Sequence, residues 1–216
     1  MNKQIAITVL LLIISIMLFS LTNIDFIVQD AFYNQQSQNW ILNRDLEPYK
    51  FIFYDGIKEL LILVAFSFLI FLIFLKKNHT LQVYRKGIIV VILSAIFVPL
   101  SVGGLKKVTN MPCPKNEVHY GGVYPSTKVW ESYPKAFNQS SIQCFPAGHA
   151  SGGFALLSLF FLFKSKRNKI ITIMGALLVG WSMGFYKMLI GDHFLSHTFI
   201  TMILAWLIVL IIKNIY

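Results

Sequence analysis

Six long apolar segments constrain the fold of this chain more than any other feature of its sequence. They lie at about residues 4–21, 58–75, 87–104, 148–164, 169–190 and 194–212. A membrane-spanning helix needs about 20 mainly apolar residues, so each segment qualifies as a span. Because six spans use most of the 216 residues, the sequence predicts a single integral membrane domain over residues 1–216. The expected fold is an all-α bundle of six transmembrane helices without a separate soluble module.

The first apolar segment could also be a cleavable signal peptide, because Lys3 precedes its apolar core. A signal peptide would need a small-x-small cleavage site after that core. The chain continues instead as Leu21-Thr22-Asn23-Ile24, which favours retention of the segment as a true span.

Basic residues orient the predicted bundle. They gather at both chain ends and in two short connections: Lys3, Lys76, Lys77, Arg85, Lys86, Lys164, Lys166, Arg167, Lys169 and Lys213. Under the positive-inside rule these residues face the cytoplasm, so both termini are cytoplasmic and the long connections 22–57 and 105–147 lie outside. Most of the net charge of +10 is explained by this topology and by contact with anionic lipids, and it requires no nucleic-acid partner.

The connection between the third and fourth spans is predicted to be an ordered but irregular external loop. Prolines and glycines interrupt it at Pro112, Pro114, Gly121, Gly122, Pro125, Pro134 and Pro146. The same loop holds both cysteines of the chain, Cys113 and Cys144. A pair on the oxidising side of a membrane favours a disulfide, which would stabilise the fold by about 3–4 kcal/mol. Two free thiols or a pair of metal ligands are the alternatives.

Ionisable side chains stand at the outward ends of four spans, where membrane proteins rarely carry such groups without a function. The third span ends near Lys106 and the fifth near Lys187. The fourth span begins at Gly148-His149, and the sixth at His193, with His197 four residues further on the same helix face. If the helices bundle, these groups share one external pocket. Lysines and helix N-termini bind phosphate there, and imidazoles can act as nucleophile or acid.

Three motifs in this region resemble the signatures of the type-2 phosphatidic acid phosphatase superfamily. The chain reads Lys106-x6-Cys113-Pro114, then Pro146-Ala147-Gly148-His149, then Lys187-x5-His193-x3-His197. The superfamily has K-x6-R-P, P-S-G-H and S-R-x5-H-x3-D at these places. The resemblance spans about residues 87–212 and implies a six-span membrane enzyme with an external site and no cofactor.

The resemblance also implies a role for each matching residue. His193 would be the nucleophile that forms a phosphohistidine, and His149 would protonate the leaving group. His197 stands where the superfamily has the aspartate that orients the nucleophile. The phosphate would be held by the remaining motif residues, Lys106, Lys187, Ala147 and Gly148.

Four positions depart from the superfamily pattern. Cys113 and Lys187 replace arginines, Ala147 replaces a serine, and His197 replaces the aspartate. A neutral imidazole brings no negative charge to its partner, and Asp192 could supply that charge only if the local turn bends it inward. The sequence leaves open which of these two residues orients His193. The Cys-Pro, Pro-Ala-Gly-His and His-x3-His forms of the three motifs are also similar to those of a bacterial branch of the superfamily. The members of that branch are described as phosphatases of lipid A or other envelope lipids.

Several of these residues have simpler interpretations. His193 and His197 have the spacing of two zinc ligands on a helix, and Lys106 and Lys107 could be interfacial anchors. His119 could belong to a turn, although the missing arginines make it a candidate for an extra phosphate contact.

Near the start of the second span, Tyr54, Asp55 and Lys58 could reach the same membrane face, and a helix-capping role is the simpler account of Asp55.

The favoured interpretation is a metal-independent lipid phosphatase of the bacterial inner membrane with a periplasmic active site. It would hydrolyse a phosphomonoester or pyrophosphate of an envelope lipid, such as lipid A, undecaprenyl pyrophosphate or phosphatidic acid, or pass the phosphoryl group to another lipid. The alternatives are a non-catalytic lipid-binding or partner protein on the same scaffold and a metal-dependent membrane hydrolase. Neither the lipid nor the oligomeric state follows from the sequence.

Overall fold

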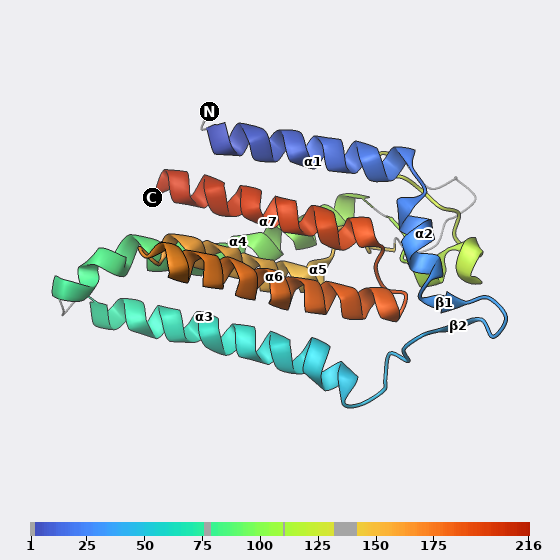
Figure 1. The fold of residues 1–216 in the computed structure, drawn as a ribbon, viewed down its shortest axis with the longest axis horizontal. Coiled ribbons are helices and arrows are strands. Elements are labelled where there is room, and N and C mark those ends of the chain that lie inside the picture. The colour runs from blue at the N-terminus through green and yellow to red at the C-terminus, as the bar shows by residue number, and fades with distance from the viewer. Residues whose placement is uncertain (1–2, 76–78, 110, 132–141) are drawn as a thin grey trace.

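The fold is an elongated bundle of roughly parallel and antiparallel helices (Figure 1). The structure is a computed structural model and describes residues 3–75, 79–109, 111–131 and 142–216. Among these residues, five helical segments are long and apolar enough to cross a membrane. The helices that form them are α1 (Lys3–Leu21), α3 (Gly56–Leu75), α4 (Arg85–Thr109), α6 (Lys166–Leu189) and α7 (Leu195–Ile215). The chain is therefore a multi-pass, mainly helical membrane protein, and five of the six predicted segments match these helices closely.

The fourth predicted segment, 148–164, is shorter than expected. It forms α5 (Gly148–Ala155), eight residues long, and continues as a six-residue 3₁₀-helix, Leu156–Phe161. At 1.5 Å and 2.0 Å per residue these pieces together rise about 24 Å, less than the roughly 30 Å of a bilayer core. The six-span count of the prediction is therefore not established by length and composition alone. This short element packs against α4, α6 and α7 inside the bundle.

Glycines bring α5 close to its neighbours. A Cβ atom on Gly153 would lie 2.7 Å from the Cα atom of Gly180 in α6, closer than real atoms approach. Next to this contact, the fully buried ring of Phe154 lies where a side chain on Gly180 would otherwise stand. Small residues at helix crossings permit such close backbone packing in membranes. This packing holds the start of α5, with His149, against the centre of the bundle.

Short elements cover one end of the bundle. The connection after α1 contains α2 (Ile24–Asp30) and an antiparallel hairpin of β1 (Tyr33–Asn34) and β2 (Asn39–Trp40), with Tyr33 opposite Trp40. The sequence did not predict this small sheet. A π-helical turn, Phe51–Asp55, leads into α3. Two 3₁₀-helices, Pro114–Asn116 and Val118–Tyr120, belong to the same end, whereas a third, His79–Tyr84, joins α3 to α4 at the opposite end (Figure 1).

An aromatic cluster fixes these elements to the start of α7. Tyr33, Tyr120 and Phe194 are buried together, with Phe26 and Trp40 packed against them. Residues of the hairpin, of α2 and of the loop after α4 thus share one apolar centre. Burial of several aromatic rings contributes on the order of a few kcal/mol each, which makes this end of the bundle an ordered cover.

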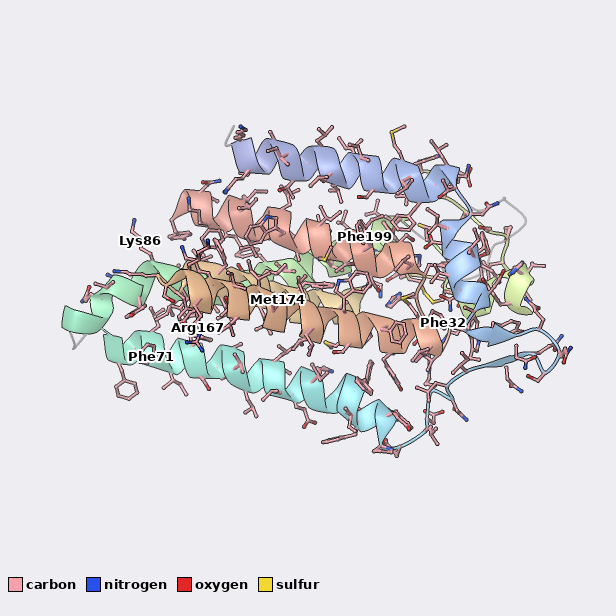
Figure 2. All side chains as sticks on the ribbon, viewed as in Figure 1. Phe32, Phe71, Lys86, Arg167, Met174 and Phe199 are labelled. Atoms are coloured by element: carbon pink, nitrogen blue, oxygen red, sulfur yellow. A yellow bond between two sulfur atoms is a disulfide. The ribbon has the colours of Figure 1, made fainter. Side chains whose placement is uncertain are left out.

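Both chain termini lie at the end of the bundle opposite the hairpin (Figure 1). The labelled basic residues Lys86 and Arg167 lie toward that same end, whereas Phe32 lies at the hairpin end (Figure 2). The bundle is thus polarised as the basic residues predict. The predicted disulfide between Cys113 and Cys144 is present. It ties the 3₁₀-helix after α4 to the segment that leads into α5.

Candidate functional site

The candidate site lies at the hairpin end of the bundle and is organised by the turn between α6 and α7. Gly191 in this turn has a φ of +71°, a left-handed conformation that favours glycine. A side chain there would also collide with the ring of Trp40. The backbone N–H groups of Asp192 and His193 both donate to the carbonyl of Lys187. The tight turn therefore places Lys187, Asp192 and His193 within one small volume.

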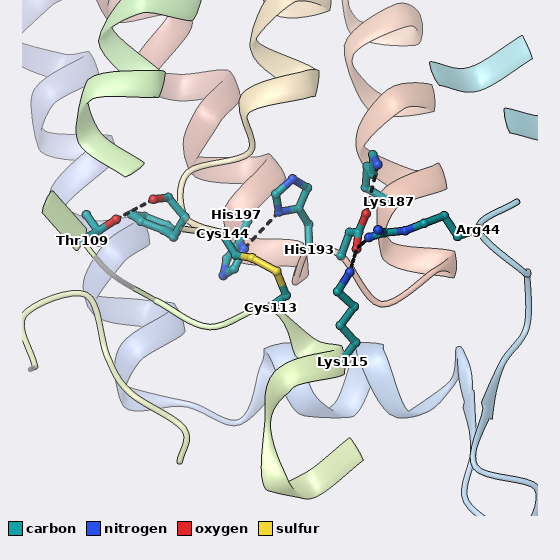
Figure 3. Close-up of a disulfide and its surroundings, with 10 residues drawn as sticks. Arg44, Thr109, Cys113, Lys115, Cys144, Lys187, His193 and His197 are labelled. Atoms are coloured by element: carbon teal, nitrogen blue, oxygen red, sulfur yellow. Dashed lines mark hydrogen bonds and ion pairs between the residues drawn. A yellow bond between two sulfur atoms is a disulfide. The ribbon is translucent and has the colours of Figure 1, made fainter. Parts of the chain in front are cut away.

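His193 and His197 face one another across the start of α7. Their Nδ1 atoms are 3.4 Å apart, and the two side chains are 3% and 0% exposed. His193 lies two residues before the helix begins and His197 lies in its first turn. Between two neutral imidazoles such a contact has one Nδ1 as donor and the other as acceptor. His197 thus holds the ring of His193 in one orientation (Figure 3).

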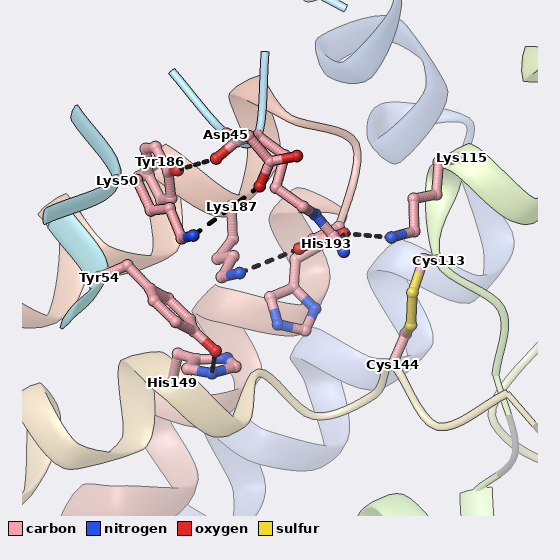
Figure 4. Close-up of polar contacts among 12 residues, drawn as sticks. Asp45, Lys50, Tyr54, Cys113, Lys115, Cys144, His149, Tyr186, Lys187 and His193 are labelled. Atoms are coloured by element: carbon pink, nitrogen blue, oxygen red, sulfur yellow. Dashed lines mark hydrogen bonds and ion pairs between the residues drawn. A yellow bond between two sulfur atoms is a disulfide. The ribbon is translucent and has the colours of Figure 1, made fainter. Parts of the chain in front are cut away.

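His149, at the start of α5, is held by a tyrosine from another element. Its Nε2 atom is 2.9 Å from the hydroxyl oxygen of Tyr54, in the π-helical turn before α3, and the two rings lie 4.6 Å apart. In Figure 4 the hydroxyl of Tyr54 points at the imidazole. The Tyr54 ring also lies under the Nζ atom of Lys187, 4.1 Å from the ring centre. Tyr54 therefore connects His149 to the cations of the site.

Three cations converge on the carboxylate of Asp192 and are here called the cation cluster: Arg44, Lys115 and Lys187 (Figure 3). Lys187 Nζ is 3.0 Å from Oδ2, Lys115 Nζ is 2.8 Å from Oδ1, and Arg44 pairs with Oδ1 as well. Burial raises the pKa of Asp192, but the charges of Lys187 and Lys115 outweigh burial and hold it below its ordinary value. Asp192 is thus an ionised partner of the cations, and among the described residues its carboxylate pairs with these cations and not with the imidazole of His193.

Sequence reasoning missed Arg44 and Lys115. Arg44 reaches the site because its segment is fixed by the hydroxyl of Tyr186, which donates to the Arg44 carbonyl. Lys115 follows Cys113 by two residues, so the disulfide holds it in place. A signal existed in each case. Arg44 is the only arginine of the chain outside the basic connections, and Lys115 lies beside the motif position that lacks its arginine. Together they return positive charge to a site whose motif arginines are replaced.

Lys106 approaches the start of α5. Its Nζ atom lies 3.4 Å from the position that a Cβ atom on Gly148 would occupy, so the absence of a side chain there leaves room for the ammonium group. The Gly148 and His149 amides stand in the first turn of α5, where backbone N–H groups have no partner within the helix. The Ala147 N–H is engaged inside the protein, donating to Thr201 Oγ1 and to the His197 carbonyl. Its expected part in phosphate binding is therefore not supported by its contacts.

His119 lies elsewhere. Its Nε2 atom is 2.8 Å from Asp30 Oδ1 in α2, and its ring packs against Phe26 and Tyr120. Both partners of the ion pair are 45% exposed. The structure thus places His119 on the outer face of the cover, paired with a carboxylate. The expectation of an extra phosphate contact at this position finds no support in these contacts.

The protonation state of His193 follows from its surroundings. Burial lowers its pKa well below the usual value, and the positive field of His197, Lys106 and Lys187 acts in the same direction. At neutral pH the imidazole is therefore uncharged, which is the form that can act as a nucleophile. Lys187 lies near His193, because its carbonyl accepts the backbone N–H of His193.

A largely apolar cavity of about 320 Å³ opens beside His149. It follows α3 from Lys58 to Phe68, a rise of about 15 Å along the helix axis. Its other walls include residues of α4, of α5 and of the 3₁₀-helix after α5: Val91, Ala95, Pro99, Gly148, Gly152, Ala155 and Leu156. The cavity therefore has a polar part, where Lys58 and His149 line it, and an apolar part that runs along membrane-spanning helices. An amphiphile with an anionic head and an apolar chain matches both parts.

The described residues include no group of three or more His, Cys, Asp and Glu side chains placed to hold a metal ion. The Nδ1 atoms of His193 and His197 contact each other. The pair therefore serves a hydrogen-bonding role in this structure.

Fold and site together describe a multi-pass helical membrane protein whose histidine and cationic side chains gather at one end of the bundle, near an apolar cavity. The chain belongs to the PAP2 superfamily, whose model matches residues 86–216, more than half of its length. Members of this superfamily are phosphatases of lipid-type phosphoesters, so the chain is a phosphoester hydrolase with a phosphorylated lipid as the expected class of substrate. Neither a curated protein nor a solved structure matches the chain significantly.

Proposed function

We propose that this protein is a membrane lipid phosphatase of the bacterial inner membrane that acts at the periplasmic face through a phosphohistidine on His193. The observation that carries the proposal is that His193, His149 and the cation cluster gather at the hairpin end of the bundle, where an apolar cavity opens beside His149. The substrate would be a phosphomonoester or pyrophosphate of an envelope lipid of the lipid A, undecaprenyl pyrophosphate or phosphatidic acid type.

Binding would use the two parts of the cavity separately. The lipid chain would lie along α3 and α4, and the phosphate would lie in the polar part beside His149 and Gly148, which Lys106 Nζ approaches. There it would meet the free amides at the start of α5, which favour anions. Arg44 and Lys115 would add charge, because they already hold a carboxylate at this position. Phosphate recognition would thus rest on residues that replace the missing arginines.

The chemical steps follow from the histidine contacts. We assign the Nδ1–H of this contact to His193, which would donate it to Nδ1 of His197 and keep the Nε2 lone pair to attack phosphorus. The N–P bond forms as the P–O bond to the lipid oxygen breaks, and His149 gives a proton to that oxygen. Burial and the charges of Lys187 and Lys106 lower the pKa of His149 to about 4, so it would take up this proton together with the anionic phosphate, whose charge favours the imidazolium. In the second step water attacks phosphorus and His149 takes a proton from it. Breakage of the N–P bond then releases phosphate and regenerates His193.

In this scheme Tyr54 is a positioning residue that holds His149, and His197 is a positioning residue that holds His193. The lysines and Arg44 would stabilise the charge on the phosphoryl oxygens in the transition state. Acceptance of the phosphoryl group by a second lipid in place of water would make the protein a phosphotransferase. The orientation proposed here has both termini in the cytoplasm, with the basic connections on the same side.

The test is phosphate release from a panel of the candidate lipids by the purified protein, with EDTA and with vanadate. Turnover that resists EDTA and is inhibited by vanadate supports the proposal. Loss of turnover with EDTA would instead indicate a metal-dependent hydrolase. Absence of phosphate release from every lipid would indicate a non-catalytic lipid-binding protein.

Substitutions make the assignment specific. His193→Ala and His149→Ala should each abolish turnover while leaving the protein folded. His119→Ala is the matched control, because its side chain is paired with Asp30 on the outer face, and it should retain turnover. Full activity of His193→Ala would refute the nucleophile.

A further inference from the structure

A second cavity, of about 280 Å³, lies on another side of the α7 start and is unused by the proposed chemistry. It is enclosed by the end of α1, by α2, by the first turns of α7 and by the loop of residues 111–131. We call it the acidic cavity. It is distinct from the channel beside His149, since its lining includes Ser196 and Ile200 of α7 in place of α3 and α4 residues.

Two carboxyl side chains line the acidic cavity, one half-buried and one buried. Asp25 of α2 accepts a hydrogen bond of 2.8 Å from the backbone N–H of Ser196, in the first turn of α7. Glu117 is only 2% exposed, and its Oε2 atom has no hydrogen-bond partner among the described residues. The Oγ1 atom of Thr127, 8% exposed and in the same lining, is also without a partner there. A buried polar atom without a partner is costly, by about 1–3 kcal/mol. Both atoms are suited to a ligand that brings hydrogen-bond donors.

The opposite wall of the acidic cavity is apolar. Phe19 and Ile16 of α1 and Ile200 of α7 pack there with Met111 and Phe145. These residues lie at the outer ends of membrane-spanning helices, where a lipid chain begins. The ring of Phe26 in the same lining offers a face to a cation. The cavity therefore combines carboxyl and hydroxyl oxygens that lack hydrogen-bond partners among the described residues with an apolar wall formed partly by membrane-spanning helices.

The charge of the lining is opposite to that of the whole chain. The chain carries a net charge of +10, but the acidic cavity is lined by Asp25, Glu117 and Glu131 against a single lysine, Lys128. Lys128 is exposed and Glu117 is buried, so a titratable carboxyl group lies deep in the cavity and the lysine ammonium lies at its rim. This order matches a dipolar headgroup whose ammonium enters first and whose phosphate stays at the rim.

We propose that the acidic cavity binds a zwitterionic phospholipid with a primary ammonium headgroup. The ammonium would donate to Glu117 Oε2 and Thr127 Oγ1, the phosphate would face Lys128, and the first part of the chains would lie on the wall of Phe19 and Met111. A site of this kind would couple the protein to the composition of its own leaflet. It does not depend on the proposed phosphatase chemistry.

The protonation of Glu117 gives the site a second measurable property. Burial raises the pKa of Glu117 to about 8, and the nearby charge of Asp25 acts in the same direction against a lowering contribution from Ser126. The other ionisable groups facing it are Glu131 and Lys128 in the lining and Tyr120, which lies close in the same loop. Because the ammonium binds the ionised carboxylate, the affinity should rise as the pH increases from about 6 to about 8.

The experiment is a calorimetric titration of the purified full chain in detergent with dioctanoyl phosphatidylethanolamine. Dioctanoyl phosphatidylglycerol has the same tails and phosphodiester without the ammonium, and it is the matched ligand. We expect the ethanolamine lipid to bind at least about tenfold more tightly, because one charge-assisted hydrogen bond is worth about that factor. Glu117→Gln should remove this difference and its pH dependence. Glu59→Gln, at an exposed position of α3, should retain both.

Three results would overturn the proposal. The first is equal affinity for the two lipids in the wild-type chain. The second is an unchanged preference in a folded Glu117→Gln variant, whose folding is checked by its thermal unfolding profile. The third is binding of free ethanolamine as tight as that of the lipid, which would indicate a site for small amines that makes no use of the apolar wall.

Discussion

Asp192 provides the sharpest test of how the site is held together. The predicted perturbation is Asp192→Asn, which keeps the size of the side chain and removes its negative charge. In the native structure the carboxylate lies among Lys187, Lys115 and Arg44. Its removal leaves three cations close together with no counter-charge, so the variant should be less stable than the native protein.

The magnitude follows from the exposure of each partner. The side chains of Lys187 and Asp192 are 8% and 11% exposed, and breaking a buried pair of this kind costs about 3–5 kcal/mol. Lys115 and Arg44 are 33% and 49% exposed, so their pairs contribute at most about 1 kcal/mol each. The asparagine oxygen can still accept one hydrogen bond, which recovers about 1 kcal/mol. A net loss of about 3 kcal/mol in the free energy of unfolding is expected.

The assay is equilibrium unfolding in detergent, with and without inorganic phosphate. Phosphate should stabilise Asp192→Asn more than the native chain, because the anion can take the place of the carboxylate among the cations. Asp45→Asn is the matched control, since Asp45 is 78% exposed, lies 3.8 Å from Lys50, and should change stability by less than about 0.5 kcal/mol. A loss below about 1 kcal/mol, or equal stabilisation of both chains by phosphate, would show that the cation cluster is not held by Asp192.

Three further predictions concern the cover of the bundle. Reduction of the Cys113–Cys144 disulfide, which spans 31 residues, should lower the free energy of unfolding by about 3–4 kcal/mol, measured with and without reductant; an unchanged value would contradict a structural role. Gly191→Ala should destabilise by at least about 1 kcal/mol, because of the left-handed φ and the contact with Trp40, whereas Gly175→Ala, with open space around it, should not. Because burial raises the pKa of Glu117 to about 8, the folded chain binds a proton there that the unfolded chain releases near pH 4.5. The stability from this group is complete at acidic pH and is lost as the pH rises toward 8, so Glu117→Gln should flatten that decline in pH-dependent unfolding.

Much of the fold is predictable from local sequence. Apolar length alone located α1, α3, α4, α6 and α7 to within a few residues, because a bilayer demands long apolar helices whatever their neighbours are. The same rule overestimated the segment 148–164, since an element enclosed by other helices can be short. The hairpin of β1 and β2 was missed because its stability comes from the ring of Tyr120, far along the chain.

The candidate site, like the fold, was predictable from the sequence only in part. Motif spacing predicted that His193 and His197 would meet and that Lys106 and Lys187 would stand beside them, and the structure places the two histidines in contact and Lys187 near His193. The pairing of Asp192 with Arg44 and Lys115 could not be predicted, because these two cations come from connections whose paths depend on tertiary contacts. His119 was expected near the phosphate, but its loop folds toward α2, where Asp30 is a closer counter-charge.

The sequence by itself determined that this chain is a membrane bundle, which of its ends carries the basic residues, and which histidines stand at the opposite ends of its helices. These properties depend on hydropathy, on charge and on spacing along single helices, all of which are local. Only the tertiary structure decided which cations surround Asp192, which residue holds His149, and where carboxyl side chains face an unfilled cavity. Such contacts join residues that are tens of positions apart, and their free energy depends on packing and exclusion of water, which no local pattern of residues specifies.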